Sequence, residues 1–385
     1  MNFTVRNHYV PQWYQRRFFK LGSGKSKLWY LDLKPDIIRR PDGSTTTRRA
    51  LRHLGPVNCF RQDHLYTLYF GEFATDVIEK QFFGAMDSLG EKAVDFFSKY
   101  SMCAGTHQAF RGMRDYLAAQ LFRTPKGLDI LRALSKSKDH QRTLHALRVA
   151  WPLYHTIWSE GVWEIVKCEQ SPTKFIISDS PVTTYNRQIF PGSAEVQQFG
   201  IARIEQIGTH TLFPLDREHC LIITNLQYVR NPRVNLLKFR ENPRYFEQTS
   251  FDLRRVQRGR EIEEQEVIAI NYVLKSNARR YIAASDQTWL YPEKKLKNRF
   301  WPKIGGKYFL MPDPRKVRFT TAILVGYKNG GAWGVNEYGH QDLDGPRAEA
   351  LRRVEWKTFQ TAKEAWDERD RLTGRGPPVD LQEYW

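Results

Sequence analysis

Apolar side chains recur at helical spacing through the first half of the chain. They fall every three or four residues between positions 75 and 100 and again from Thr106, which predicts two amphipathic helices. Thr106 has the chemistry of an N-cap, and Pro125 ends the second helix because the residue before a proline disfavours helical geometry. More helix is predicted to about Trp158, interrupted at Pro152. The centre of the chain is therefore expected to be mostly helical.

After Gly161 the pattern changes to short apolar runs, which predict strands. An earlier run of this kind occurs at residues 27–33, before a Pro, Gly and Thr-rich loop that reaches Thr47. The later strands are expected at Val162–Cys168, Lys174–Ser178, His210–Phe213 and Cys220–Thr224. An amphipathic helix follows at residues 261–284. Because helices come first and strands later, we expect an α+β protein, with a helical central region packed on a mostly antiparallel sheet.

The residues after Pro314 predict a small three-stranded sheet with one helix. An Asn-Gly-Gly turn at residues 329–331 is typical of a hairpin. The predicted elements are strands at 317–327, 332–338 and 354–360 and a helix at 361–372. The segment around Phe359 and Glu364 is similar to the end of the three-stranded AP2 and integrase-arm DNA-binding modules, although Thr361 with Glu364 also forms a capping box on structural grounds alone.

These patterns predict three parts along the chain. Residues 1–293 are expected to form a main α+β domain. Residues 294–314 are rich in Lys and Arg, and we expect a basic linker that is extended by self-repulsion. Residues 315–385 are expected to form a small ββ-βα module that binds nucleic acid or a partner.

The balance of charge points to a polyanionic partner. The 385 residues include 60 Lys and Arg against 42 Asp and Glu, a formal net charge of +18, which attracts nucleic acid, whether RNA or DNA. Residues 230–260 carry much of this excess, interleaved with aromatic residues that suit a phosphate backbone and stacked bases. The alternatives are a solvated basic loop and a surface that serves only solubility. No apolar run approaches the roughly 18 residues needed to span a bilayer, so no membrane partner is expected.

The cysteines and histidines give no metal or cofactor motif. The four cysteines are isolated along the chain, and we expect reduced, buried thiols in a cytoplasmic protein: Cys59, Cys103, Cys168 and Cys220. A crowded group could be imagined as a zinc site, but its spacings match no familiar ligand pattern: His53, Cys59, Asp63 and His64. Cofactors therefore stay unknown.

Residues 7–18 alternate polar and aromatic side chains too densely for a frayed terminus. They lack the charged-then-apolar run of a secretory signal, so none is expected. Because Pro11 is tolerated only in the first turn of a helix, we expect residues 8–10 to be extended and a short helix to begin near Pro11. That helix would project Gln12 and Arg16 from one face.

This opening, with His8, Val10, Pro11, Gln12, Arg16 and Phe18, resembles that of a mostly bacterial family, the domain of unknown function numbered 4238. Further matches follow in order along the chain: Asp63 with Tyr66, Glu79, Gln120 with Arg123-Thr124-Pro125, Ser178-Asp179-Ser180-Pro181, and Phe213-Pro214-Leu215. The resemblance covers roughly residues 1 to 285. Ser180 departs from it, since family members usually carry Asn there. The family has no established activity, so the resemblance implies an architecture rather than a reaction.

The matched polar residues define a candidate site. His8 and Asp179 are hypothesised as the catalytic acid and base, because an imidazole and a carboxylate can divide proton transfer near neutral pH. Gln12, Arg16 and Arg123 are expected to hold a phosphate or carboxylate. The supporting residues are Asp63, Glu79 and Ser178. The alternative for each is structural, because Asp before Ser-Pro is ordinary turn chemistry and Arg often forms a buried ion pair.

No linear motif names a reaction. The chain lacks a phosphate-binding Gly-x-x-x-x-Gly-Lys loop, a Gly-x-Ser-x-Gly elbow and a His-Glu-x-x-His pair, and the spacings of known nuclease motifs are absent. The first hypothesis is nucleic-acid processing at the His/Asp/Arg site, in the form of RNA cleavage by a hydrolase or nuclease in a phage-defence or toxin setting. The second is a non-catalytic nucleic-acid-binding or protein-binding module whose polar motif is structural.

Overall fold

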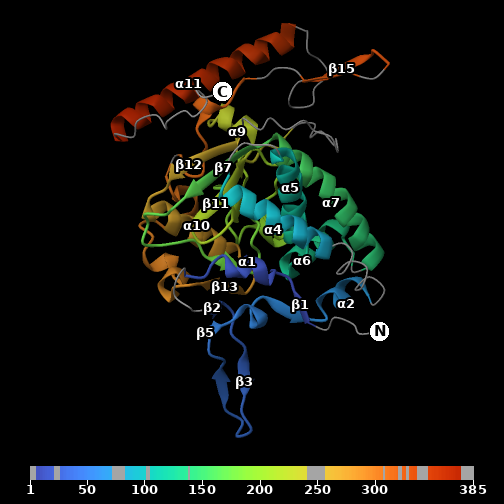
Figure 1. The fold of residues 1–385 in the computed structure, drawn as a ribbon, viewed down its shortest axis with the longest axis vertical. Coiled ribbons are helices and arrows are strands. Elements are labelled where there is room, and N and C mark those ends of the chain that lie inside the picture. Colours follow the sequence, from blue (N-terminus) through green and yellow to red (C-terminus); the bar gives the residue numbers. More distant parts are fainter. Residues whose placement is uncertain are drawn as a thin grey trace.

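A computed structural model gives the fold of this chain and confirms that it is mixed α+β, with helices, antiparallel sheets and one mixed sheet (Figure 1). It describes ten stretches: residues 6–20, 27–71, 83–100, 105–137, 139–240, 256–306, 308–319, 323–326, 329–335 and 346–373.

The predicted helical centre is confirmed. It consists of α4 (Gly84–Ser98), α5 (Thr106–Phe122), α6 (Pro125–Ser135) and α7 (His140–Glu160). The expected start of the first helix, near residue 75, lies outside the described residues. Contrary to the predicted interruption, α7 continues through Pro152. Proline costs a helix one hydrogen bond, and burial of Tyr154, Ile157 and Trp158 on the following turns holds α7 together.

A five-stranded sheet packs against these helices, in the order β12-β7-β11-β10-β9. Its strands are β7 (Val162–Lys167), β9 (Thr183–Tyr185), β10 (His210–Pro214), β11 (His219–Thr224) and β12 (Val256–Glu261). All neighbours are antiparallel except β12, which runs parallel to β7. The strands predicted near residues 162, 210 and 220 are therefore confirmed. Their side chains are buried on both faces, which accounts for near-continuous apolar runs without alternation.

A second, four-stranded sheet has the order β5-β2-β13-β8 and is antiparallel throughout. Its strands are β2 (Leu28–Asp32), β5 (Leu51–Leu54), β8 (Ile177–Ser178) and β13 (Tyr281–Ala284). The helix predicted over 261–284 is wrong in its last part, because α10 spans only Glu264–Asn277 and residues 281–284 form β13. Pairing with β2 and β8 on both sides overrides the helical pattern there.

The N-terminal segment has the predicted extended and helical parts. β1 (Arg6–His8) pairs with β6 (Arg61–Asp63), and α1 (Gln12–Arg16) begins directly after Pro11. The remaining short helical elements are η1 (Pro56–Asn58), α2 (Leu65–Phe70), α8 (Ala194–Phe199) and α9 (Leu226–Arg230). Tyr9, Val10 and Tyr14 are buried in the same core cluster as the strands of both sheets. The first residues of the chain therefore form part of the main core.

A short hairpin projects from the end of the molecule opposite α11 (Figure 1). It consists of β3 (Ile37–Arg39) and β4 (Thr45–Thr47), in a region that the sequence predicted as a loop. Gly43 turns the chain between them with a φ of +82°, which only glycine adopts without strain. The hairpin has no buried side chain, so the expected apolar alternation of a strand is missing and sequence patterning could not find it.

The predicted basic linker at 294–314 is not extended. Short 3-10 turns lie along it and at its ends: η4 (Gln287–Leu290), η5 (Pro292–Lys294), η6 (Trp301–Lys303) and η7 (Pro314–Lys316). Trp301, Ile304 and Leu310 are buried in the main core. Burial of these apolar side chains outweighs the repulsion among the linker's cations.

The C-terminal unit differs from the predicted three-stranded sheet. The expected hairpin is present as β14 (Ile323–Gly326) and β15 (Ala332–Val335), but residues 354–360 lie within a long helix, α11 (Pro346–Thr373). Phe359, Ala362 and Trp366 recur at helical spacing and are buried, so the period of burial is that of a helix. Phe359 packs with Leu226 and Val229 of α9, which joins α11 to the main body. The similarity to three-stranded DNA-binding modules therefore fails at its third strand.

Gly127, in the first turn of α6, is closely packed on the end of α5. A Cβ there would lie 1.9 Å from the Leu121 carbonyl oxygen and 2.7 Å from Phe122 Cα, both backbone atoms. We expect Gly127→Ala to lower the free energy of unfolding by about 1–3 kcal/mol or more, because the backbone must shift. Gly112→Ala in α5 is the matched control, since its Cβ would be 3.6 Å from Ala93 Cβ and helix propensity favours Ala. Denaturant unfolding of both variants measures the difference, and equal stabilities would contradict this packing.

His210 gives the fold a pH dependence. It is buried in β10, its Nδ1 lies 3.0 Å from Thr224 Oγ1, and burial lowers its pKa to about 3. The unfolded chain, with a His pKa near 6.5, binds this proton first, so stability falls as the pH drops from about 6.5 towards 3. We expect His210→Gln to make the slope of unfolding free energy against pH shallower by about 1.4 kcal/mol per pH unit near pH 5. His107→Gln, at an exposed position, should leave the slope as it is.

Candidate functional site

The backbone of residues 8–10 is held by three long polar side chains. Arg123 Nη2 donates to the His8 carbonyl oxygen at 3.0 Å, and Gln120 Nε2 donates to the Tyr9 carbonyl oxygen at 2.9 Å. Gln15 Nε2 donates to the Val10 carbonyl oxygen at 2.9 Å. These carbonyls lie in the core, where an unpaired backbone acceptor is costly. Two of the matched residues, Gln120 and Arg123, therefore serve the chain's own backbone.

Arg123 makes several contacts inside the protein. Its side chain is almost completely buried, its Nη1 lies 2.5 Å from Asp87 Oδ1, and its guanidinium lies 5.5 Å from the centre of the Phe83 ring. Burial by itself lowers the pKa of Arg123. The nearby Asp87 carboxylate is among the groups that raise it, and the net pKa is above the usual value, so the guanidinium stays charged. The charge that was expected to hold an anionic substrate is thus neutralised by Asp87.

Asp179 accepts hydrogen bonds from three consecutive backbone N–H groups. Its carboxylate oxygens lie 2.8 Å from Arg279 N, 2.6 Å from Arg280 N and 2.8 Å from Tyr281 N, and the residue is only 4% exposed. Burial raises the pKa of Asp179, against the effect of these donors and of nearby Lys126. The carboxylate follows β8 and holds the start of β13, so it joins two neighbouring strands. Its oxygens are occupied by the backbone rather than directed at a substrate.

His8 lies near Arg123 but makes no hydrogen bond or ion pair with Asp179. Its Nε2 lies 3.1 Å from the Val57 carbonyl oxygen, which suits a neutral imidazole that donates there. Burial lowers the pKa of His8, and the cations Arg61 and Arg123 add to that effect. The imidazole is therefore neutral at pH 7 and held by the Val57 backbone carbonyl.

The remaining predicted site residues are dispersed. Arg16 is exposed and Gln12 half-buried on α1, as the predicted helix face requires, while Asp63 is exposed on β6. Ser178 is buried, and its hydroxyl oxygen accepts from Ser180 N at 3.2 Å. Glu79 lies outside the described residues. The structure brings Arg123 to the His8 backbone, but it does not gather the predicted side chains around one opening.

A small cavity lies where the Arg123-Thr124-Pro125 and Ser178-Asp179-Ser180-Pro181 segments approach each other. Thr124, Lys126, Ser180 and Thr184 are among its lining residues, and its volume is about 10 Å³. The hydroxyl oxygens of Ser180 and Thr184 are buried there without a hydrogen-bond partner, and burial lowers the pKa of Lys126 to about 8. A space of this size admits about one water molecule and no larger substrate.

A much larger opening, which sequence reasoning missed, lies between α9 and α11. We call it the basic groove: it has a volume of about 520 Å³ and is lined by Arg187, Tyr228, Asn231, Pro232, Arg233, Tyr308, Lys357, Thr358, Thr361, Ala362, Ala365 and Trp366. None of these described lining residues is acidic. Arg187 Nη2 donates to the Pro302 carbonyl oxygen at 2.8 Å, a neutral partner, and Arg187 forms no ion pair with any described residue. Arg233 and Lys357 have exposed side chains that make no ion pair within the described stretches.

Of the six described cations in the basic stretch at 230–260, three are withdrawn from solvent and three are exposed. Arg230 is buried between Phe319 and Phe359, and Arg240 forms a buried ion pair with Glu160. Arg260 binds Glu164 through two contacts of 2.8 Å. Of this stretch, Arg233 reaches the basic groove, and the aromatic residues at 245, 246 and 251 lie outside the described residues. The run of Lys and Arg in the sequence includes one residue of the groove. Only the tertiary structure distinguishes cations that pair inside the protein from cations that can bind a polyanion.

The described residues contain no group of three or more His, Cys, Asp or Glu side chains that could hold a metal ion. Cys59, Cys168 and Cys220 are free and buried, which confirms that expectation for them, and Cys103 lies outside the described residues. Burial raises the pKa of Cys59 and Cys168 to about 12. Among the parts of the chain that are described, no helix is long and apolar enough to cross a bilayer.

Comparison with known families adds one finding. A family model described as "Protein of unknown function (DUF4238)" matches residues 154–288. Over this segment the chain is similar to that family. The segment runs from the end of α7 to β13 and includes Ser178 and Asp179, whereas His8, Gln12, Arg16 and Arg123 precede it. No curated protein and no solved structure matches the chain.

The three hydrogen bonds to Asp179 predict that its substitution affects stability. Asp179→Asn keeps the shape but leaves one oxygen acceptor where there were two, so at least one buried N–H loses its partner. We expect the free energy of unfolding to fall by about 1–3 kcal/mol. Ser178→Ala is the matched control, because it removes a single neutral contact at 3.2 Å in the same turn. Chemical denaturation measures both, and an Asp179→Asn protein as stable as Ser178→Ala would contradict a structural role.

Proposed function

We propose that this chain binds single-stranded nucleic acid in the basic groove and does not cleave it. The observation that carries the proposal is the lining of the groove, with three cations and no acidic side chain among its described residues. Cationic grooves of this kind follow a phosphate backbone and bind more weakly as salt rises. This is the second of the two hypotheses from the sequence, with the groove as its binding site.

The groove has polar and aromatic groups suited to nucleotides as well as charge. Tyr228 and Tyr308 line it beside the three cations, and Tyr308 packs edge-to-face on Trp366 with ring centres 4.7 Å apart. A ring fixed in this way loses little entropy when a base packs against it. The hydroxyls of Thr358 and Thr361 offer hydrogen bonds to phosphate or ribose.

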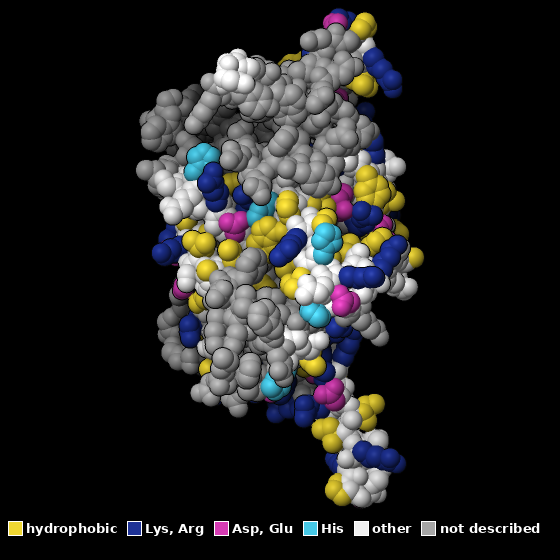
Figure 2. All heavy atoms as spheres, turned by 90° about the vertical axis from the view of Figure 1, so that its right-hand side faces the viewer, with side chains coloured by type: hydrophobic (Ala, Val, Ile, Leu, Met, Phe, Trp, Pro, Cys, Tyr) yellow, Lys and Arg dark blue, Asp and Glu magenta, His cyan; other side chains and the backbone are white. Residues whose placement is uncertain are grey.

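The cations of the groove come from three separate segments that the fold holds together. Arg187 follows β9, Arg233 follows α9, and Lys357 lies on α11. Arg315 of η7 anchors α11 through contacts of 2.8 Å to Asp367 and 2.6 Å to Asp370. By contrast, Figure 2 shows a face on which Lys, Arg and His side chains alternate with Asp, Glu and hydrophobic ones. The three cations of the groove differ from those on this face in having no acidic neighbour among the described lining residues.

The contacts of the matched polar residues favour binding over cleavage. Asp179 and Arg123 have internal partners, and His8 donates to a backbone carbonyl. The cavity beside Asp179 is too small for a nucleotide. The hypothesis of RNA cleavage in a defence or toxin setting stays a prediction, which the same binding experiment tests by inspecting the nucleic acid afterwards.

The test is fluorescence anisotropy with labelled single-stranded RNA, single-stranded DNA and duplex DNA, each titrated at several salt concentrations. We expect single strands to bind more tightly than duplex, with affinity falling steeply as salt rises. Arg233→Ala with Lys357→Ala removes two phosphate contacts and should weaken binding about tenfold or more at low salt, while reducing the salt slope by about two.

The matched control removes the same charge elsewhere. Lys92 on α4 and Arg148 on α7 are exposed and do not line the groove, so Lys92→Ala with Arg148→Ala should bind almost as the wild type does. Equal weakening in both double variants would show that only net charge acts and would overturn the groove proposal. Gel analysis of the recovered strands completes the test, since cleavage that His8→Ala abolishes in a folded protein would restore the catalytic hypothesis.

A further inference from the structure

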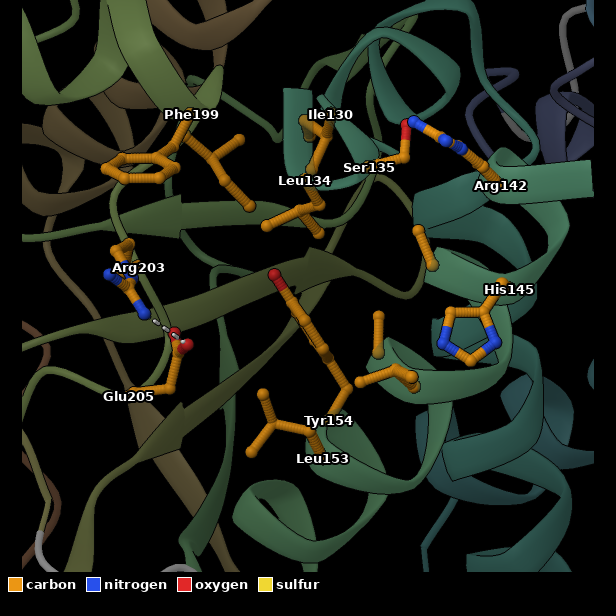
Figure 3. A pocket seen from close by; sticks show the side chains of 14 residues that line it. Ile130, Leu134, Ser135, Arg142, His145, Leu153, Tyr154, Phe199, Arg203 and Glu205 are labelled. Atoms are coloured by element: carbon orange, nitrogen blue, oxygen red, sulfur yellow. Dashed lines mark hydrogen bonds and ion pairs between the residues drawn. The ribbon is translucent and has the colours of Figure 1, made fainter. Parts of the chain in front are cut away.

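A second large pocket lies between α6, α7 and the segment around α8 (Figure 3). We call it the apolar pocket: its volume is about 580 Å³, within the range of sites that hold small organic ligands. Its apolar walls are formed mainly by Ile130, Leu134, Val149, Leu153, Phe199 and Ile201. Val149 is 56% exposed, so the pocket opens to solvent along α7.

Tyr154 places a polar group inside these apolar walls. The residue is only 5% exposed, and Figure 3 shows its hydroxyl oxygen directed to the middle of the pocket. Within the described residues this hydroxyl makes no hydrogen bond. Burial raises the pKa of Tyr154, with Glu205 as a further cause, so the phenol stays protonated. A phenol that faces an open pocket without a protein partner can donate to a ligand that supplies an acceptor.

The charges around the apolar pocket leave one cation uncompensated. On one side Arg203 Nη2 binds Glu205 Oε1 at 2.9 Å, and the Arg203 guanidinium lies 5.0 Å from the Phe199 ring centre. This pair is self-neutralised and fixed in place. On the opposite side Arg142 is exposed and forms no ion pair within the described part of the chain (Figure 3). The lining therefore carries a net charge of one positive unit beside a large apolar surface.

We propose that the apolar pocket is a binding site for a small amphipathic monoanion, a molecule with an apolar body and one carboxylate, sulfonate or phosphate head. The apolar body lies against α6 and α7, the head group contacts Arg142, and an acceptor near the middle of the ligand accepts from Tyr154. This site is separate from the basic groove, with which it shares no lining residue. It therefore does not rest on the nucleic-acid function.

The probe for the test is 8-anilinonaphthalene-1-sulfonate, which has an apolar aromatic body and one sulfonate and fluoresces when it leaves water. We expect saturable one-site binding to the full chain, and competition by dodecanoate. Ala146→Trp should abolish the signal, because an indole at this lining position fills the pocket. Tyr154→Phe should weaken binding about two- to tenfold through the lost hydrogen bond. Arg142→Gln should weaken it about two- to fivefold through the lost charge.

Arg148→Gln is the matched control, since it removes an exposed cation from the same helix without touching the pocket. It should leave probe affinity unchanged. Thermal unfolding and nucleic-acid binding are measured on every variant, so that loss of the fold or of the groove is recognised. The proposal is overturned if the probe does not saturate, if Ala146→Trp binds it as the wild type does, or if Arg142→Gln and Arg148→Gln behave alike. If the wild type does not bind the probe, the proposal of a small-anion site is rejected.

Discussion

Buried backbone groups that belong to no regular strand or helix need hydrogen-bond partners, and this requirement organises the structure. The N-terminal segment enters the core at residues 8–10, where β1 ends. Gln15, Gln120 and Arg123 donate to three successive carbonyls of that segment. An unpaired group at such a place costs on the order of 1–3 kcal/mol, so these side chains are as necessary to the fold as its apolar core.

The same principle acts at the junction between the two halves of the second sheet. Asp179 accepts from three backbone N–H groups just before β13, and Asn271 on α10 binds Ile176 N at 3.1 Å and the Lys174 carbonyl oxygen at 2.8 Å. Asn271 holds the chain before β8, and Asp179 holds it after β8. Arg123 and Asp179, two of the buried polar residues predicted to form the site, thus bind irregular backbone.

Positive charge is divided between two roles. Arg240 and Arg260 pair with Glu160 and Glu164 inside the protein, whereas Arg233 and Lys357 stand in a groove that has no acidic lining residue among those described. Only cations of the second kind are available to a polyanion. The apolar pocket has a different chemistry, with one uncompensated cation at the edge of an apolar wall. The two openings therefore suit different ligands, one rich in phosphate and one mostly apolar.

The sequence by itself determined the α+β class, the helical centre, most strands of the larger sheet and the short helix after Pro11, because burial periodicity and proline act locally. Residues 281–284 and 354–360 were assigned wrongly, since short apolar runs suit either period and the neighbours at β2 or α9 decide between them. The roles of Arg123 and Asp179 were also beyond the sequence. Whether a polar side chain serves substrate or backbone depends on which distant peptide groups the fold leaves unpaired beside it, and only the tertiary structure fixes that.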